Sequence, residues 1–357
     1  NVQLRHLFED IFDDITNEEY QLLNLDELYW MWSRGVAYHH AGLAPIVKEF
    51  VEFLFINRHI DILFATETLS LGINMPAKSI IIDSSFKYDG LKTRLISKSE
   101  FLQLTGRAGR RGIDSKGYAY INYDKRVENS WYNDLFDLKP NNLKSSYSNS
   151  YGSVLNLNNK YGEKKGIEMI KKSFYSYQNK LNDKALETNY KAKLKVLNEM
   201  NYFTDLKKNK LLTETHRDNL ILGIEMLNEN NDIEFCLMFL ASGISTSKYE
   251  ISVHDKYNDL LTKYLITQEK VNKLEAFSGV KNKINLDITW FSIFLEFYNS
   301  DNIEYTLSKF NVTLGDFIKA CREASEISQK VYSIYEIENF DKIAKKLKHN
   351  IIQKTMI

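Results

Sequence analysis

The feature that most constrains the fold is a change of pattern near residue 135. Before it, apolar runs of strand length, such as residues 60–66 and 79–83, alternate with amphipathic helical stretches. After it, strand patterns nearly vanish and long amphipathic helices dominate. Buried strands that alternate with helices indicate a parallel sheet covered by helices. We therefore expect an α/β domain over 1–135, followed by all-α structure.

Local signals sharpen this division. Residues 35–39 and 117–123 have strand patterns, and Pro45 is expected to begin a helix over 46–57 because proline is tolerated in the first helical turn. Ser97 and Glu100 have capping-box spacing before a short helix towards Thr105. Beyond the change of pattern, residues 206–213 resemble a short two-stranded wing, the one expected exception to helix.

The charge of the chain is unevenly distributed. The formal net charge is zero, but residues 1–135 carry 15 basic and 19 acidic side chains, residues 136–219 carry 16 and 9, and residues 220–357 carry 16 and 19. The balances are −4, +7 and −3, so a basic block lies between mildly acidic flanks. Such a block is typical of contact with a polyanion, which the neutral total conceals.

Composition excludes several classes of protein. An apolar fraction of 43 % excludes a disordered chain, and two cysteines, Cys236 and Cys321, exclude a disulfide scaffold. Both cysteines lie in apolar helical patterns and are expected to be buried and reduced, which favours an intracellular compartment, cytoplasmic or nuclear. No apolar run approaches the roughly 18 residues that span a bilayer, so no membrane partner is expected.

The most informative string is Gln103-Leu-Thr-Gly-Arg-Ala-Gly-Arg-Arg-Gly112. Arg107 and Arg110 are three residues apart, so on a helical turn they would point to one side. The glycines permit close backbone approach, and guanidinium groups offer a fixed fork of donors that suits a polyphosphate. The alternative, a solvated basic turn, does not account for this spacing.

Two further strings lie upstream. Ala65-Thr-Glu-Thr-Leu-Ser-Leu-Gly-Ile-Asn-Met-Pro-Ala77 follows an apolar strand, at the edge where α/β sheets bind ligands, although a helix cap would use the same residue types. Gly35-Val-Ala-Tyr-His-His-Ala-Gly-Leu43 contains paired histidines. No cysteine or acidic residue lies at ligand spacing from them, so we expect no metal site.

In this order and spacing, the three strings resemble the second RecA-like domain of superfamily 2 helicases. They are most similar to the superkiller-like DExH-box RNA helicases, the exosome-associated type and its bacterial relatives. In that family residues 66–77 correspond to motif V and residues 103–110 to motif VI. Phe86-Lys-Tyr-Asp-Gly90 resembles the family's Lys-Phe-Asp-Gly. Arg111 stands where the related DNA-repair branch usually has proline, which favours the RNA branch and leaves a DNA helicase as the alternative.

The resemblance implies a role for each matching residue. Arg110, Arg107 and Gln103 would be catalytic, with Arg110 as the arginine finger. The implied nucleotide-binding residues are Gly72, Asn74, Gly106, Arg107 and Arg110, and the implied nucleic-acid-binding residues are Thr66, Glu67, Thr68, His40, Lys319 and Arg322. ATP and Mg²⁺ would be the cofactors, with the Mg²⁺ ligands in a first RecA-like domain.

The remaining chain resembles the family's later domains. Residues 136–215 would form a winged helix and residues 216–357 a C-terminal helical bundle with its ratchet helix after Gly315. There Ala320, Ala324, Ile327, Val331 and Ile334 recur at a spacing that indicates a buried stripe, opposite Lys319 and Arg322. Single-stranded RNA is the implied partner, together with an exosome-like nuclease or accessory complex, and the motor is expected to be monomeric.

One half of an ATPase is not recognisable. The chain contains no Gly-x-x-x-x-Gly-Lys-Ser/Thr phosphate loop, and Asp26-Glu27-Leu28-Tyr29 lies in a helical stretch and lacks the histidine of an Asp-Glu-x-His box. The sequence therefore predicts the C-terminal part of an ATP-dependent RNA helicase, 3′-to-5′ in direction and acting in RNA processing or decay. Alone it is expected to be inactive. A non-enzymatic RNA-binding scaffold derived from a helicase is the remaining alternative.

Overall fold

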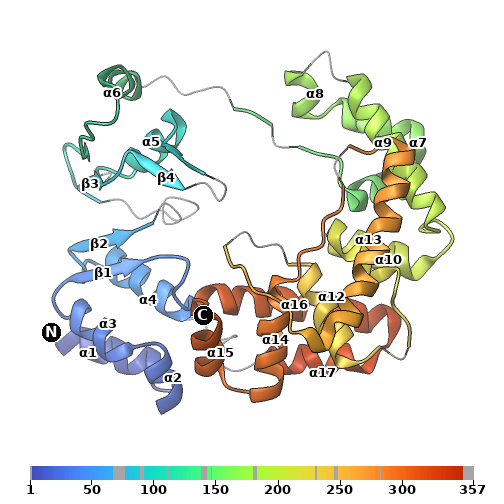
Figure 1. Cartoon of the computed structure of the whole chain (residues 1–357). Helices are drawn as coiled ribbons and strands as arrows, with labels where there is room; N and C mark the ends of the chain where they lie inside the picture. The colour runs from blue at the N-terminus through green and yellow to red at the C-terminus, as the bar shows by residue number, and fades with distance from the viewer. Residues whose placement is uncertain are drawn as a thin grey trace. The chain divides into compact units, whose positions relative to one another are not determined.

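The structure is a computed structural model (Figure 1). It describes residues 2–66, 77–88, 92–110, 112–137, 143–145, 147–179, 183–229, 231–244, 248–281 and 283–348. These residues form two units. The first comprises the described residues of Asn1–Asn142 and Thr313–Asp316, and the second comprises those of Leu143–Val312 and Phe317–Ile352.

The first unit alternates helices and strands, as its sequence predicts. Its elements are α1 (Val2–Phe12), α2 (Asn17–Leu22), α3 (Leu25–Trp32), β1 (Val36–His39), α4 (Pro45–Ile56), β2 (Ile62–Ala65), β3 (Ser79–Ile82), β4 (Phe86–Tyr88), β5 (Thr93–Leu95), α5 (Lys98–Thr105), β6 (Tyr118–Ile121) and α6 (Asn129–Phe136). Pro45 occupies the first turn of α4, and the rejected Asp-Glu string lies in α3.

The described strands form small two-stranded sheets, two of them parallel and one antiparallel. β1 pairs with β2 in the register His39 to Ala65, β3 pairs with β6 in the register Ile82 to Ile121, and β4 and β5 form an antiparallel pair. The expectation of buried strands was wrong for β2 and β6, most of whose side chains are exposed. A two-stranded sheet offers each strand one neighbour, and the described helices cover only part of its faces.

A hydrophobic core holds α5 and α6 against the pair β3–β6. Its fully buried members are Ile82, Ile96, Phe101 and Leu135, and partly buried apolar residues of β3, α5, β6 and α6 pack around them. This core fixes α5, and with it Gln103 at the start of the string that the sequence singles out.

Every regular element among the described residues of the second unit is a helix. Its elements are α7 (Tyr151–Lys171), α8 (Phe174–Gln178), α9 (Asp183–Glu199), α10 (Leu206–Thr215), η2 (Asp218–Leu220), α11 (Ile221–Ile224), α12 (Ile233–Ser242), η3 (Asp255–Tyr257), α13 (Asn258–Ser278), α14 (Thr289–Ser300), α15 (Ile303–Phe310), α16 (Leu314–Tyr335) and α17 (Glu338–Lys346). Helices α7 and α9, both green in Figure 1, lie side by side, and α7 is kinked at Gly162, where φ is 73°.

The predicted wing over 206–213 was wrong, because these residues form helix α10. The Asp205 side chain caps the helix by accepting hydrogen bonds from the backbone N–H groups of Lys207 and Lys208, at 3.0 and 3.1 Å. Leu211 and Leu212 are fully buried. The cap and this burial stabilise a helix where the lysine-rich sequence suggests a ribbon.

The predicted stripe on α16 is confirmed, since Ala320, Ala324, Ile327, Val331 and Ile334 are all buried. Cys236 and Cys321 are buried free thiols, as expected. The assignment of 136–215 to a winged helix and of 216–357 to a ratchet bundle stays a prediction. Among the described helices, none combines the length and apolar character needed to span a bilayer.

Candidate functional site

The helix that leads into the arginine-rich string is capped as the sequence predicts. Backbone N–H of Glu100 donates to the Ser97 hydroxyl, and backbone N–H of Ser97 donates to the Glu100 carboxylate at 2.7 Å, which completes a capping box. α5 then runs to Thr105 and its C-cap is Gly106. Gln103, one of the predicted catalytic residues, lies exposed on this helix.

Glu100 also ties α5 to the hairpin β4–β5. Arg94 donates two hydrogen bonds to its carboxylate, at 2.9 and 2.8 Å, and Lys87 donates a third at 2.8 Å. The Arg94 guanidinium and the Lys87 ammonium together hold the pKa of Glu100 well below its usual range, against the opposing effect of burial. The hairpin that includes residues 86–88 of the Lys-Phe-Asp-Gly-like string is therefore anchored to the helix that precedes Arg107.

The arginine-rich segment itself is not helical, so the helical-turn premise for Arg107 and Arg110 was wrong. α5 ends before Arg107, and Gly109 adopts a φ of 91°, which is left-handed and incompatible with a continuing helix. The segment instead forms a parallel bridge with Ala77. Ala77 N–H donates to Arg107 O at 3.0 Å and Gly109 N–H donates to Ala77 O at 2.7 Å.

This bridge brings the end of the motif V-like string (residues 65–77) beside the motif VI-like string (residues 103–112). Ala77 is the last residue of the motif V-like string, and it pairs directly with Ala108 in the motif VI-like string. On the other side Gly117 packs so closely that a β-carbon there would lie 2.4 Å from the Ala108 carbonyl. Glycine is therefore required at 117 to seat the segment against the start of β6.

The Arg110 guanidinium is held by Asp114. Arg110 Nε and Nη2 donate to the two carboxylate oxygens at 2.7 and 2.8 Å. Hydrogen bonds from Arg110 keep the pKa of Asp114 well below its usual range. Arg107, three residues earlier in the chain, is half-buried. Both predicted guanidinium groups therefore belong to the segment that contacts Ala77 and Gly117.

The paired-histidine string (residues 35–43) and the start of the motif V-like string (residues 65–77) meet at the edge of the sheet β1–β2. His40 and Thr66 directly follow paired strands, and Thr66 N–H donates to His39 O at 3.1 Å. His40 Nδ1 accepts from Gly42 N–H at 3.1 Å, and its ring stacks on Tyr38 at 5.5 Å. His39 points into the interior, where its Nε2 lies 2.8 Å from a Glu52 carboxylate oxygen.

The remaining predicted site residues fall into two groups. Glu67, Thr68, Gly72 and Asn74 lie outside the described residues. Lys319 is exposed and Arg322 half-buried on α16, on the side away from the buried stripe, and both belong to the second unit. The structure thus brings together Gly106, Arg107 and Arg110, and places His40 beside Thr66.

Sequence reasoning missed the pairing of Asp114 with Arg110. It also missed that Glu100, besides capping α5, bonds the hairpin β4–β5 to this helix. The string Arg111-Gly112-Ile113-Asp114 served only to distinguish branches of the family. The available signal was an acidic residue four positions after an arginine, which is a pairing distance in a compact turn as well as in a helix.

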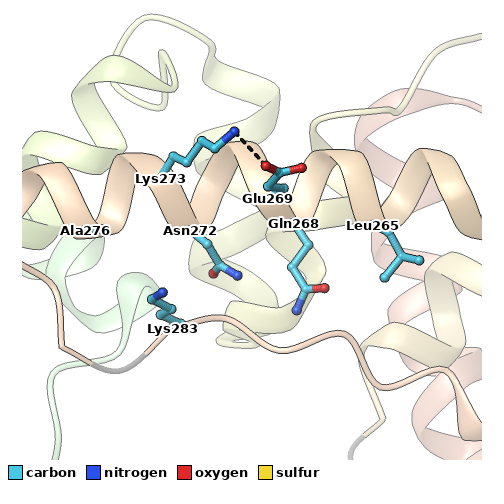
Figure 2. A pocket seen from close by; sticks show the side chains of 7 residues that line it. All are labelled: Leu265, Gln268, Glu269, Asn272, Lys273, Ala276 and Lys283. Carbon is cyan, nitrogen blue, oxygen red and sulfur yellow. Dashed lines mark ion pairs between the residues drawn. The ribbon is translucent and has the colours of Figure 1, made fainter.

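A pocket of about 340 Å³ lies in the second unit, between α13 and the segment that follows it. Figure 2 shows Gln268, Asn272 and Lys283 around this space, with the Lys273–Glu269 ion pair at 2.6 Å on the helix. The lining is mostly polar and it includes none of the predicted site residues. Ligand pockets are usually apolar with a few polar groups, so we assign no ligand to it.

Among the described residues, no cluster of three or more histidine, cysteine, aspartate or glutamate side chains is arranged to hold a metal ion. The donor set on the first unit is cationic instead. Guanidinium groups on a fixed turn fit the phosphates of a nucleotide and do not fit Mg²⁺, whose ligands are oxygens.

Comparison with known proteins shows what kind of domain the first unit contains. Residues 13–112 match the helicase conserved C-terminal domain. The chain is 36 % identical over 175 residues to the human exosome RNA helicase MTR4, covering 49 % of this chain and 17 % of MTR4. It is 32 % identical over 234 residues to the Arabidopsis thaliana DExH-box ATP-dependent RNA helicase DExH10, covering 61 % and 24 %. It is 38 % identical over 154 residues to the probable helicase HelY of Mycobacterium tuberculosis, covering 42 % and 17 %.

The matched segments therefore span about a quarter of these curated relatives or less. They agree with the strings that carry the resemblance, since residues 13–112 include all three. The chain thus contains a helicase conserved C-terminal domain, and its matches are to the C-terminal portion of superkiller-like DExH-box helicases of superfamily 2.

Proposed function

We propose that this chain is part of an ATP-dependent RNA helicase in which it supplies the phosphate-sensing half of the ATP site. The observation that carries the proposal is the turn after α5, on which Arg107 and Arg110 follow one another and which Ala77 fixes by two backbone hydrogen bonds. A polyphosphate is the natural ligand of such a cationic turn.

In this proposal Arg110 is the arginine finger, Arg107 binds the same phosphates and Gln103 orients the nucleotide or the attacking water. Gly106 lets the backbone turn beneath the phosphates. Charge on the transferring phosphoryl group is stabilised by such guanidinium groups. Mg²⁺ would be held by oxygen ligands in a first RecA-like domain, and ATP hydrolysis would require that domain.

RNA would be the polymer that is moved. Residues 66–68 and His40 would contact its backbone from the first unit, and Lys319 and Arg322 would contact it from α16. We extend the proposal to 3′-to-5′ movement, RNA processing or decay, an exosome-like nuclease or accessory partner, a monomeric motor and an intracellular location. Two of the similar proteins, human MTR4 and DExH10 of Arabidopsis thaliana, are RNA helicases by name, and this supports the choice of RNA.

Not every lysine of the basic block in the second unit is free to bind RNA, because several are paired with carboxylates. Glu187 accepts hydrogen bonds from both Lys171 and Lys191 at 2.6 Å, which holds its pKa at about 2. Lys193 and Lys208 are also paired with carboxylates. Several lysines of the block thus form ion pairs within the unit, and in this proposal the other lysines supply the electrostatic attraction to RNA.

The test is RNA-stimulated ATP hydrolysis by the full-length protein with Arg110→Ala. We expect turnover to fall by about 10³- to 10⁵-fold, the size of an arginine-finger contribution. Arg126→Ala is the matched control, because Arg126 is an exposed guanidinium of the same unit that pairs with Asp124. Undiminished turnover in Arg110→Ala would refute the assignment.

Matched RNA and DNA duplexes with 3′ overhangs would separate the two helicase branches. We expect unwinding of the RNA duplex, and a clear preference for DNA would favour the repair branch. A wild-type protein that binds RNA but hydrolyses no ATP would favour the scaffold.

A further inference from the structure

Two backbone hydrogen bonds return to Arg110 from residues that follow it. Backbone N–H groups of Ile113 and Asp114 both donate to the carbonyl oxygen of Arg110, at 3.0 and 2.9 Å. Gly112 adopts a φ of 78°, which lets the backbone reverse within this short segment. The turn returns the chain so that the Asp114 side chain faces the residue from which the turn began.

Three hydrogen bonds then join Asp114 to Arg110. Besides the bonds from Nε and Nη2, the backbone N–H of Arg110 donates to Asp114 Oδ2 at 3.0 Å. The Asp114 side chain is 9 % exposed and that of Arg110 is 29 % exposed. The carboxylate is therefore held inside the turn, whereas part of the guanidinium faces outward.

The geometry divides the donors of the guanidinium. Asp114 occupies the edge formed by Nε and Nη2, and no described residue accepts a hydrogen bond from Nη1. A guanidinium offers five N–H donors, so Nη1 and the second hydrogen of Nη2 remain for a ligand. The carboxylate thus fixes the orientation of the group without using the donors that a phosphate needs.

A positive charge on a neighbouring segment adds to the hydrogen bonds from Arg110 that lower the pKa of Asp114. Lys78, which lies between Ala77 and β3, adds its attraction to that of Arg110 and helps to hold the pKa of Asp114 below its usual range. Ala77 is hydrogen-bonded to Arg107 and Gly109. These backbone bonds tie the segment that carries Lys78 to the segment that carries Arg110.

We propose that Asp114 is a positioning residue that orients the Arg110 guanidinium towards the transferring phosphoryl group. The inference rests on the proposed function. An arginine side chain has several rotatable bonds, and a finger that must be ordered only when the phosphate arrives loses rate. Held by Asp114, the group is ordered beforehand, and its contribution is realised at the transition state.

The experiment uses the full-length protein with Asp114→Asn, Asp114→Glu and the control Asp124→Asn. The asparagine has one oxygen acceptor and turns an NH₂ group towards the second guanidinium N–H, so at most one of the two side-chain bonds survives. Asp124 is the matched control because it pairs with Arg126 in the same unit by a similar set of hydrogen bonds. RNA-stimulated kcat, the KM for ATP, and affinities for ADP and for ADP with aluminium fluoride are measured.

We expect Asp114→Asn to lower kcat by about 10- to 100-fold, the usual cost of misplacing a catalytic group. KM and ADP affinity should change little, whereas affinity for ADP with aluminium fluoride, a transition-state analogue, should fall in parallel with kcat. Asp114→Glu should restore part of the rate, and Asp124→Asn should retain the wild-type values. In an Arg110→Ala background, Asp114→Asn should have no further effect, because Asp114 acts only through Arg110.

Two sets of results would overturn the inference and they are distinguishable. Wild-type kcat in Asp114→Asn beside a collapsed rate in Arg110→Ala would overturn the role of Asp114 and leave the proposed function intact. An equal loss of ADP affinity and kcat, or an additive loss in the Arg110→Ala background, would mean that Asp114 only maintains the fold. An undiminished rate in Arg110→Ala would overturn both the inference and the proposed function.

Discussion

A buried carboxyl group at the centre of the second unit provides the sharpest prediction of stability. Glu275 on α13 is fully buried, and the hydroxyl of Tyr151, which is 1 % exposed on α7, donates to it at 2.8 Å. The backbone N–H of Ile284 donates to its other oxygen at 3.2 Å. Burial raises the pKa of Glu275 above its usual value, while the bond from Tyr151 opposes that rise.

The perturbation is Tyr151→Phe, which removes one hydroxyl and keeps the ring. The ring packs under the ammonium of Lys193, 4.2 Å from its centre, so this contact and the core volume are retained. Glu275 is left with the single bond from Ile284. A hydrogen bond to a charged group contributes about 1.5–3 kcal/mol, and one between neutral groups about 0.5–1.5 kcal/mol.

The loss should depend on pH. The pKa of Glu275 is raised in the folded state, so its contribution to stability is fully present below the unfolded pKa and is lost as pH rises through the folded pKa. Tyr151→Phe raises the folded pKa further, because the lost bond favoured the carboxylate. We expect a deficit of about 1.5–3 kcal/mol near neutral pH, which shrinks towards about 0.5–1.5 kcal/mol on acidification.

The assay is urea unfolding read by pulse proteolysis, with peptides of α13 quantified by mass spectrometry at about pH 7.5 and about pH 5. Tyr264→Phe is the matched control, since the Tyr264 hydroxyl is buried on the same helix with no hydrogen-bond partner among the described residues. Its removal should cost nothing. A deficit in Tyr151→Phe that is equal at both pH values, or no greater than that of the control, would refute the reasoning.

Three further predictions concern packing and charge. Phe294→Ala should lower the free energy of unfolding by about 3–5 kcal/mol in urea titration, because the ring is fully buried and stacks on Trp290 at 5.7 Å. Gly166→Ala should lower the melting temperature despite its better helix propensity, because the new methyl would lie 2.3 Å from the hydroxyl of buried Tyr190; an increase would contradict this. Glu100, whose pKa is depressed, stabilises the hairpin β4–β5 above its unfolded pKa and loses this effect as pH falls through the folded pKa. Hydrogen exchange should therefore show acid-induced loss of hairpin protection in the wild type and a pH-independent, lower protection in Glu100→Gln.

The sequence by itself determined the features that depend on neighbours along the chain. The capping box of Ser97 and Glu100, the start of α4 at Pro45 and the buried stripe on α16 were all predictable. Each depends on a spacing of three or four residues or on the fixed φ of proline, and such local geometry is independent of what packs against it.

Tertiary structure decided the rest. Residues 206–215 form a helix because Leu211 and Leu212 are buried against other helices, which propensity alone does not specify. Arg110 faces Asp114 because Gly109 leaves the helical conformation and Ala77, from a segment distant in the sequence, holds the turn. The sequence predicted that the guanidinium groups bind phosphate, but their orientation depends on backbone contacts between distant segments, which a local pattern does not specify.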